Sequence, residues 1–130
     1  MGDELQGIPP SAASTYERLL RAPERAPEAL RRSVDRYLET ILEAAQTRTH
    51  LDTDLAKRIT KACHGLIDLL PGAVPDHKRH IVAAVEYFLL PRDGEDDLAY
   101  ADGLDDDAMV VTAVANALGR PDLHVPVPQR

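Results

Sequence analysis

The sequence is poor in the residues that stabilise secreted proteins and aromatic cores. Its 130 residues include one cysteine, one phenylalanine and no tryptophan. A single cysteine, Cys63, excludes an intrachain disulfide and therefore a disulfide-stabilised extracellular fold. The first residues carry neither the basic nor the apolar region of a signal peptide, so we expect a cytoplasmic protein.

Long apolar runs and concentrated basic charge are also missing. The longest apolar run, residues 81–90, is interrupted by Glu86 and is about half of the roughly 20 residues that span a bilayer. We therefore expect no membrane span. The chain carries 15 Lys and Arg against 22 Asp and Glu, a formal net charge of −7. This balance argues against nucleic acid as the partner, because phosphate neutralisation requires a basic surface.

Catalytic signatures are absent as well. The chain lacks the phosphate loop, the G-x-S-x-G elbow, the H-E-x-x-H zinc motif and any pair of cysteines. His64 follows Cys63 directly, but neighbouring helical positions point about 100° apart and do not form a nucleophile–base pair. We interpret Cys63 as a packing residue. No catalytic residue is predicted, and the sequence favours a non-catalytic protein without settling the question.

What the chain does contain is helix formers with helical periodicity. Apolar residues recur every three or four positions between charged ones, and no segment alternates with period two. A short helix is predicted from Ser11 or Ser14 to Pro23. Longer amphipathic helices are predicted over residues 27–47, 53–70, 76–90 and 105–118, with Asp52 or Thr53 and Asp76 as caps. The fold class is therefore all-α, a compact bundle of four to five amphipathic helices.

This pattern also predicts the domain organisation and the core. Residues 1–10 are expected to be a flexible N-terminus, 11–120 a single helical domain and 121–130 a proline-rich extended tail. The predicted core comprises the apolar residues at the centre of each stripe: Leu38, Ile41, Ile59, Leu66, Val85, Phe88, Val111 and Val114.

Nearly all of the charge imbalance lies in residues 91–107, which we call the acidic segment. It contains one basic residue, Arg92, and eight carboxylates: Asp93, Glu95, Asp96, Asp97, Asp102, Asp105, Asp106 and Asp107. The last three precede a predicted helix, where carboxylates cap free N–H groups and meet a favourable dipole. The first four carboxylates follow the C-terminal end of the preceding predicted helix, where the helix dipole is negative. Capping of a helix therefore does not explain them.

Three interpretations of the acidic segment remain open. It binds a basic protein segment or a neighbouring subunit, it binds a divalent cation, or it is simply solvated. In the first interpretation carboxylates steer a basic partner and apolar side chains anchor it. The predicted partner-binding residues are Asp93, Glu95, Asp96, Asp97, Leu98, Tyr100, Asp102 and Leu104.

The same stretch resembles the YkvA-like family of small helical domains of unknown function. The matching residues are Tyr87 to Asp93, then Asp97, then Gly103-Leu104-Asp105-Asp106 before an apolar helix. The resemblance spans residues 78 to about 118 and departs where Glu95-Asp96 replaces the family's Ile-Pro. It implies an all-α fold and no established reaction. It also places four carboxylates around one turn, where Mg²⁺, Mn²⁺ or Ca²⁺ would find oxygen ligands: Asp93, Asp97, Asp105 and Asp106. No other cofactor is expected.

A second polar feature is the run His77-Lys78-Arg79-His80. The two histidines, three positions apart, present either half of a metal site or a solvated first helical turn, and we expect the solvated turn. Lys78 and Arg79 would lie at the positive end of a helix dipole, where an anion or an acidic partner would offset their charge.

Overall fold

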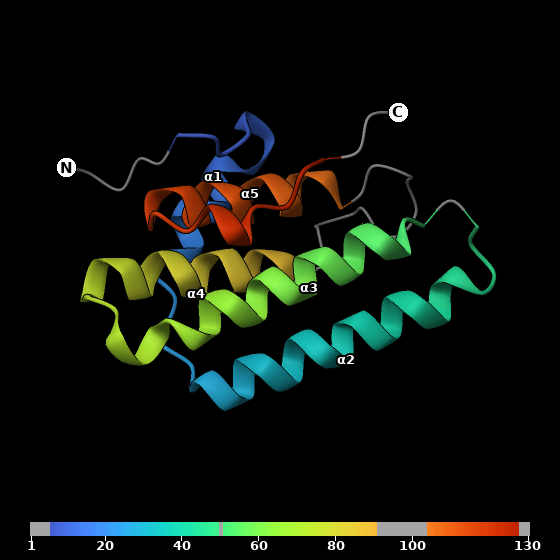
Figure 1. The fold of residues 1–130 in the computed structure, drawn as a ribbon, viewed down its shortest axis with the longest axis horizontal. Helices are drawn as coiled ribbons and strands as arrows, with labels where there is room; N and C mark the ends of the chain where they lie inside the picture. The colour runs from blue at the N-terminus through green and yellow to red at the C-terminus, as the bar shows by residue number, and fades with distance from the viewer. Residues whose placement is uncertain (1–5, 50, 91–103, 128–130) are drawn as a thin grey trace.

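The computed structural model describes residues 6–49, 51–90 and 104–127 of the chain (Figure 1). This part of the chain is 73% helical and contains no strand, which confirms the all-α prediction. Its α-helices are α1 (Ala13–Leu19), α2 (Pro27–Ala45), α3 (Thr53–Asp68), α4 (Pro75–Leu89) and α5 (Asp105–Ala117).

The four longer helices form an up-and-down bundle. Each of α3, α4 and α5 runs antiparallel to the helix before it, as the colours in Figure 1 show. The helix α2 packs mainly on α3, α4 packs on α5, and the short α1 packs on α4. The C-terminal end of α4 and the N-terminal end of α5 therefore lie at the same end of the bundle (Figure 1).

The helix starts follow local chemistry. Pro27 is the first residue of α2, a position where its missing N–H is not needed. Asp52 caps α3 by accepting a 2.9 Å hydrogen bond from the backbone N–H three residues later. The predicted Asp76 cap is wrong. Pro75 already occupies the first helical position, so Asp76 lies within the first turn of α4 and forms an ion pair with Arg79.

The end of α5 requires a glycine. Gly119 has a φ of +70°, a backbone conformation that side chains with a Cβ rarely adopt. Its N–H donates to the carbonyl of Asn116 at 3.1 Å, and the N–H of Arg120 donates to the carbonyl of Ala115 at 2.9 Å. These two bonds form a Schellman motif and end the helix where the sequence predicts.

Seven of the eight predicted core residues are 0% exposed, which confirms their positions in the core. The exception is Leu38, which is half-buried and packs at the edge of the core. The buried stripe of α2 consists of Leu30, Val34 and Ile41. At 100° per residue, Leu38 lies roughly 60° from the centre of that stripe. Because α2 packs mainly on one neighbour, its buried stripe is narrow and Leu38 falls at its margin.

The segment that the sequence predicts as an extended tail packs on the bundle as far as the structure describes it. Pro121–Leu123 form a 3₁₀ turn, η4. Val125 is buried, and its backbone N–H donates to Thr112 Oγ1 of α5 at 2.8 Å. Gly65 of α3 makes room for the turn, because a Cβ there would lie 2.5 Å from Leu123 Cδ2.

Candidate functional site

Most of the predicted acidic site falls outside the described residues. Those partner-binding residues are Asp93, Glu95, Asp96, Asp97, Leu98, Tyr100 and Asp102, and they include both Asp93 and Asp97 of the predicted metal set. The structure describes the residue before the acidic segment, Leu90 after α4, and the last four residues of the segment, which begin with Leu104 before α5. It also describes the last three carboxylates, at the start of α5.

These last carboxylates occupy the first turn of α5 rather than its cap position. The cap position is held by Leu104, whose apolar side chain accepts no hydrogen bond, and Asp105, Asp106 and Asp107 follow it. Carboxylates in a first helical turn are stabilised by the positive end of the helix dipole. Asp106 Oδ2 also accepts a 2.7 Å hydrogen bond from Ser11 Oγ, which connects the N-terminal part of the chain to α5.

Leu104 itself is only 3% exposed and belongs to the core. Its side chain packs beneath the start of α5 and is not available at the surface as an apolar anchor for a partner. The anchors that remain in the partner hypothesis are Leu98 and Tyr100.

Asp107 differs from its neighbours because its side chain is 1% exposed. It lies near the fully buried Cys63 of α3. Burial raises the pKa of the Cys63 thiol well above its usual range, and the nearby charge of Asp107 raises it further. A thiol held protonated in this way is a poor nucleophile, which agrees with the interpretation of Cys63 as a packing residue.

The metal hypothesis has two of its four predicted ligands in the described part of the chain, Asp105 and Asp106, both half-buried. In residues 6–49, 51–90 and 104–127 no three His, Cys, Asp or Glu side chains gather closely enough to hold a metal ion. Asp93 and Asp97 lie outside these ranges, so the four-carboxylate site stays a prediction.

The prediction of a solvated turn at His77 and His80 is wrong for His80. His77 is exposed, but His80 is 5% exposed because α1 covers that face of α4. The hydroxyl of Tyr16 lies 2.6 Å from His80 Nδ1, and the two rings stack with centroids 5.8 Å apart. The basic charge predicted at this turn is offset locally, since Arg79 donates to Asp76 and holds the pKa of that carboxyl below its usual range.

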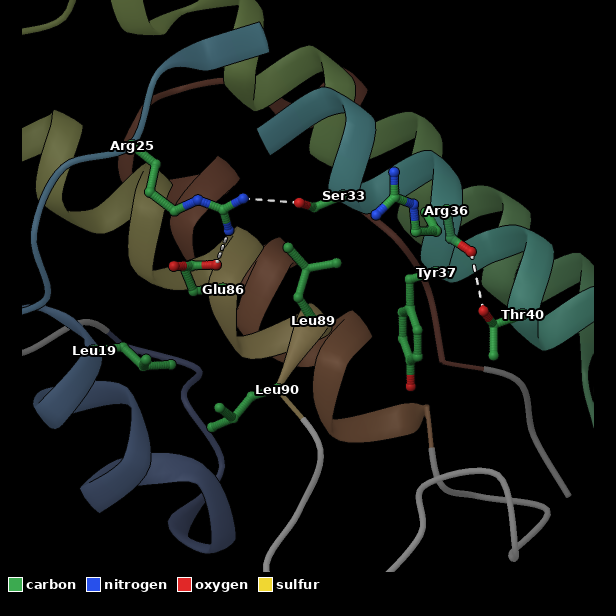
Figure 2. Close-up of a pocket in the computed structure, with 9 residues that line it drawn as sticks. All are labelled: Leu19, Arg25, Ser33, Arg36, Tyr37, Thr40, Glu86, Leu89 and Leu90. Carbon is green, nitrogen blue, oxygen red and sulfur yellow. Dashed lines mark hydrogen bonds and ion pairs between the residues drawn. The ribbon is translucent and has the colours of Figure 1, made fainter. Parts of the chain in front are cut away.

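A pocket of about 430 Å³ opens between α1, α2 and α4, at the side where α4 ends (Figure 2). Its lining combines an apolar floor with polar and charged rims, and none of it was singled out as a site by the sequence. The lining residues are Leu19, Arg25, Ser33, Arg36, Tyr37, Thr40, Glu86, Leu89 and Leu90.

The charged rim of this pocket is fixed by Arg25, in the connection between α1 and α2. Its guanidinium donates to Glu86 Oε1 of α4 and to Ser33 Oγ of α2, both at 2.8 Å (Figure 2). The side chains of Arg25 and Glu86 are 34% and 20% exposed. Only Glu86 of this pair has a signal in the sequence, because it is the one charge within the apolar run of residues 81–90. Its partner lies 61 positions away and has no sequence signal.

The opposite rim is formed by α2. Arg36 is exposed, while the ring of Tyr37 lies against Phe88 in an edge-to-face contact with centroids 5.1 Å apart. Thr40 donates its hydroxyl to the carbonyl of Arg36 at 3.1 Å, so its donor is used within the helix. On this rim the pocket therefore has the ring of Tyr37 as an aromatic wall and the exposed Arg36 as its basic side chain.

No family model matches the chain, and no curated protein or solved structure matches it. The resemblance to the YkvA-like family consequently stays a prediction. Among the helices that the structure describes, none combines the length and apolar character needed to cross a membrane.

Proposed function

We propose that the protein is a non-catalytic helical interaction domain that uses the acidic segment to bind a basic protein segment, from a partner or from a neighbouring copy. The observation that carries the proposal is the concentration of eight carboxylates with one arginine in residues 91–107. The remaining chain has balanced charge. A concentrated field of one sign selects and steers partners of the opposite sign.

The bundle supports this function because the residues on either side of positions 91–103 belong to it. Leu90 follows the last turn of α4, and Leu104 is buried in the core before α5. These two ends lie at the same end of the bundle (Figure 1). The hydrogen bond from Ser11 to Asp106 connects the start of α5 to the N-terminal part of the chain. We infer that a partner of the segment would bind near the end of the bundle where α4 ends and α5 begins.

Binding of a labelled arginine-rich peptide, measured by fluorescence anisotropy, tests this proposal. Replacing Asp96 and Asp97 by Asn removes two carboxylates and should weaken binding roughly three- to tenfold at low salt. The matched control replaces Glu39 and Glu43, two exposed carboxylates of α2, by Gln. Equal loss of affinity in both double variants would show that only net charge matters and would contradict a specific site.

The second candidate function is a divalent-metal site formed by Asp93, Asp97, Asp105 and Asp106. It is favoured by the presence of Asp105 and Asp106 in the first turn of α5, which begins shortly after the stretch of sequence that contains Asp93 and Asp97. Calorimetry with Mg²⁺, Mn²⁺ and Ca²⁺, together with thermal melts with and without EDTA, distinguishes it from the first. Heat of binding and a higher melting temperature support the metal site, and the absence of both removes it.

A further inference from the structure

We propose that the pocket between α1, α2 and α4 binds a small amphipathic anion, with a carboxylate on Arg36 and an apolar chain on the leucines of the floor. The pocket volume of about 430 Å³ is within the range of small-molecule sites, roughly 300–1,000 Å³. The lining residues all lie outside residues 91–107 in the sequence, and the test of this site does not depend on the function proposed above.

The sign of the ligand charge follows from the three charged side chains of the lining. Arg25 and Glu86 neutralise each other at 2.8 Å. The other terminal nitrogen of Arg25 donates to Ser33 Oγ at 2.8 Å and to the carbonyl of Ala29 at 3.5 Å. Arg36 forms no ion pair with a described residue. Among the described residues, the pocket lining therefore carries one positive charge without an ion-pair partner, and the planar guanidinium of Arg36 suits a carboxylate.

The apolar part of the ligand follows from the floor. Figure 2 shows Leu89 and Leu90 at the end of α4, Leu19 on α1 and the ring of Tyr37 on α2 around the same space. The three leucines are half-buried, so each leaves apolar surface for a ligand to cover. A charged head alone would leave this surface in water, and an apolar chain alone would leave Arg36 without a partner. A molecule with both parts uses the whole pocket.

Octanoate is a suitable probe, titrated into the full chain and followed by NMR of leucine methyl groups. We expect saturable binding with a Kd on the order of 0.1–1 mM, as reached by ligands of about ten heavy atoms. Shifts should occur at Leu19, Leu89 and Leu90 and not at Leu118, a half-buried leucine outside the pocket that follows the last residue of α5. Acetate, which lacks the chain, and octylamine, which has the opposite charge, should bind far more weakly.

The decisive variant is Arg36→Gln, with Arg32→Gln as its control, since Arg32 is an exposed arginine of α2 outside the pocket. Arg36→Gln should weaken octanoate binding about tenfold and leave octanol binding unchanged, because only the carboxylate contacts the guanidinium. Arg32→Gln should change neither.

Several results would overturn the proposal. Equal weakening of octanoate and octanol by Arg36→Gln would mean that the substitution damages the pocket. Octylamine binding tighter than octanoate would mean that the surrounding acidic charge dominates. Binding to vesicles of anionic lipid without binding of free octanoate would assign the surface to a membrane instead of a soluble ligand.

Discussion

The buried contact between Tyr16 and His80 yields the sharpest prediction about stability. It joins α1 to α4 through a 2.6 Å hydrogen bond between side chains that are 2% and 5% exposed. Tyr16→Phe keeps the ring and its stacking but removes the hydroxyl. Because His80 Nδ1 then loses this partner in a buried site, unfolding free energy should fall by about 1–3 kcal/mol.

Urea denaturation followed by circular dichroism measures this loss. With an m-value of about 1.5 kcal/mol/M, a 2 kcal/mol loss moves the midpoint by roughly 1.3 M. The double variant Tyr16→Phe/His80→Leu replaces both polar partners by apolar groups. It should lose less than the sum of the single variants, with a coupling of about 0.5–3 kcal/mol. Additive losses, or a Tyr16→Phe change below about 0.5 kcal/mol, would refute the reasoning.

Three further predictions concern burial and charge. Leu66→Ala, at a fully buried position, should cost about 2–5 kcal/mol, and the half-buried Leu38→Ala distinctly less; equal midpoint shifts in urea would contradict the packing. Cys63 should resist iodoacetamide at pH 8 until the protein unfolds, because its thiol pKa is raised; rapid alkylation of the folded chain, seen by mass spectrometry, would oppose this. Asp76, whose pKa is lowered first by its hydrogen bond from Arg79, contributes stability above its usual pKa and loses it as pH falls through the lowered value. Asp76→Asn should therefore flatten the acid side of a melting-temperature profile, whereas an unchanged profile would speak against the pair.

The fold was largely predictable because its determinants are local. Periodic apolar positions predict the buried faces, and Pro27, Asp52 and Gly119 predict helix ends from chemistry that acts within one turn. The two errors have different causes, one local and one in the packing of α2. A proline at the first position of α4 excluded the expected Asp76 cap, and a narrow stripe on α2 left Leu38 at the edge.

The sites were less predictable because they depend on contacts between distant residues. The burial of His80 requires α1 to cover α4, and nothing near His80 in the sequence indicates that Tyr16 will contact it. The pocket likewise depends on Arg25 meeting Glu86. Leu104 lies among acidic residues in the sequence, which predicts an exposed anchor, yet its side chain is buried in the core.

The most direct test of the central claim is the kinetics of binding to a basic partner segment, measured by stopped-flow at low salt and at about 500 mM salt. Reversing Asp96 and Asp97 to Lys should mainly slow association and flatten its salt dependence, while Tyr100→Ala should mainly speed dissociation. The control reverses Glu39 and Glu43 of α2 and should leave both rates close to those of the wild type. Unchanged rates in the Asp96 and Asp97 variant would contradict the claim that the acidic segment is the binding surface.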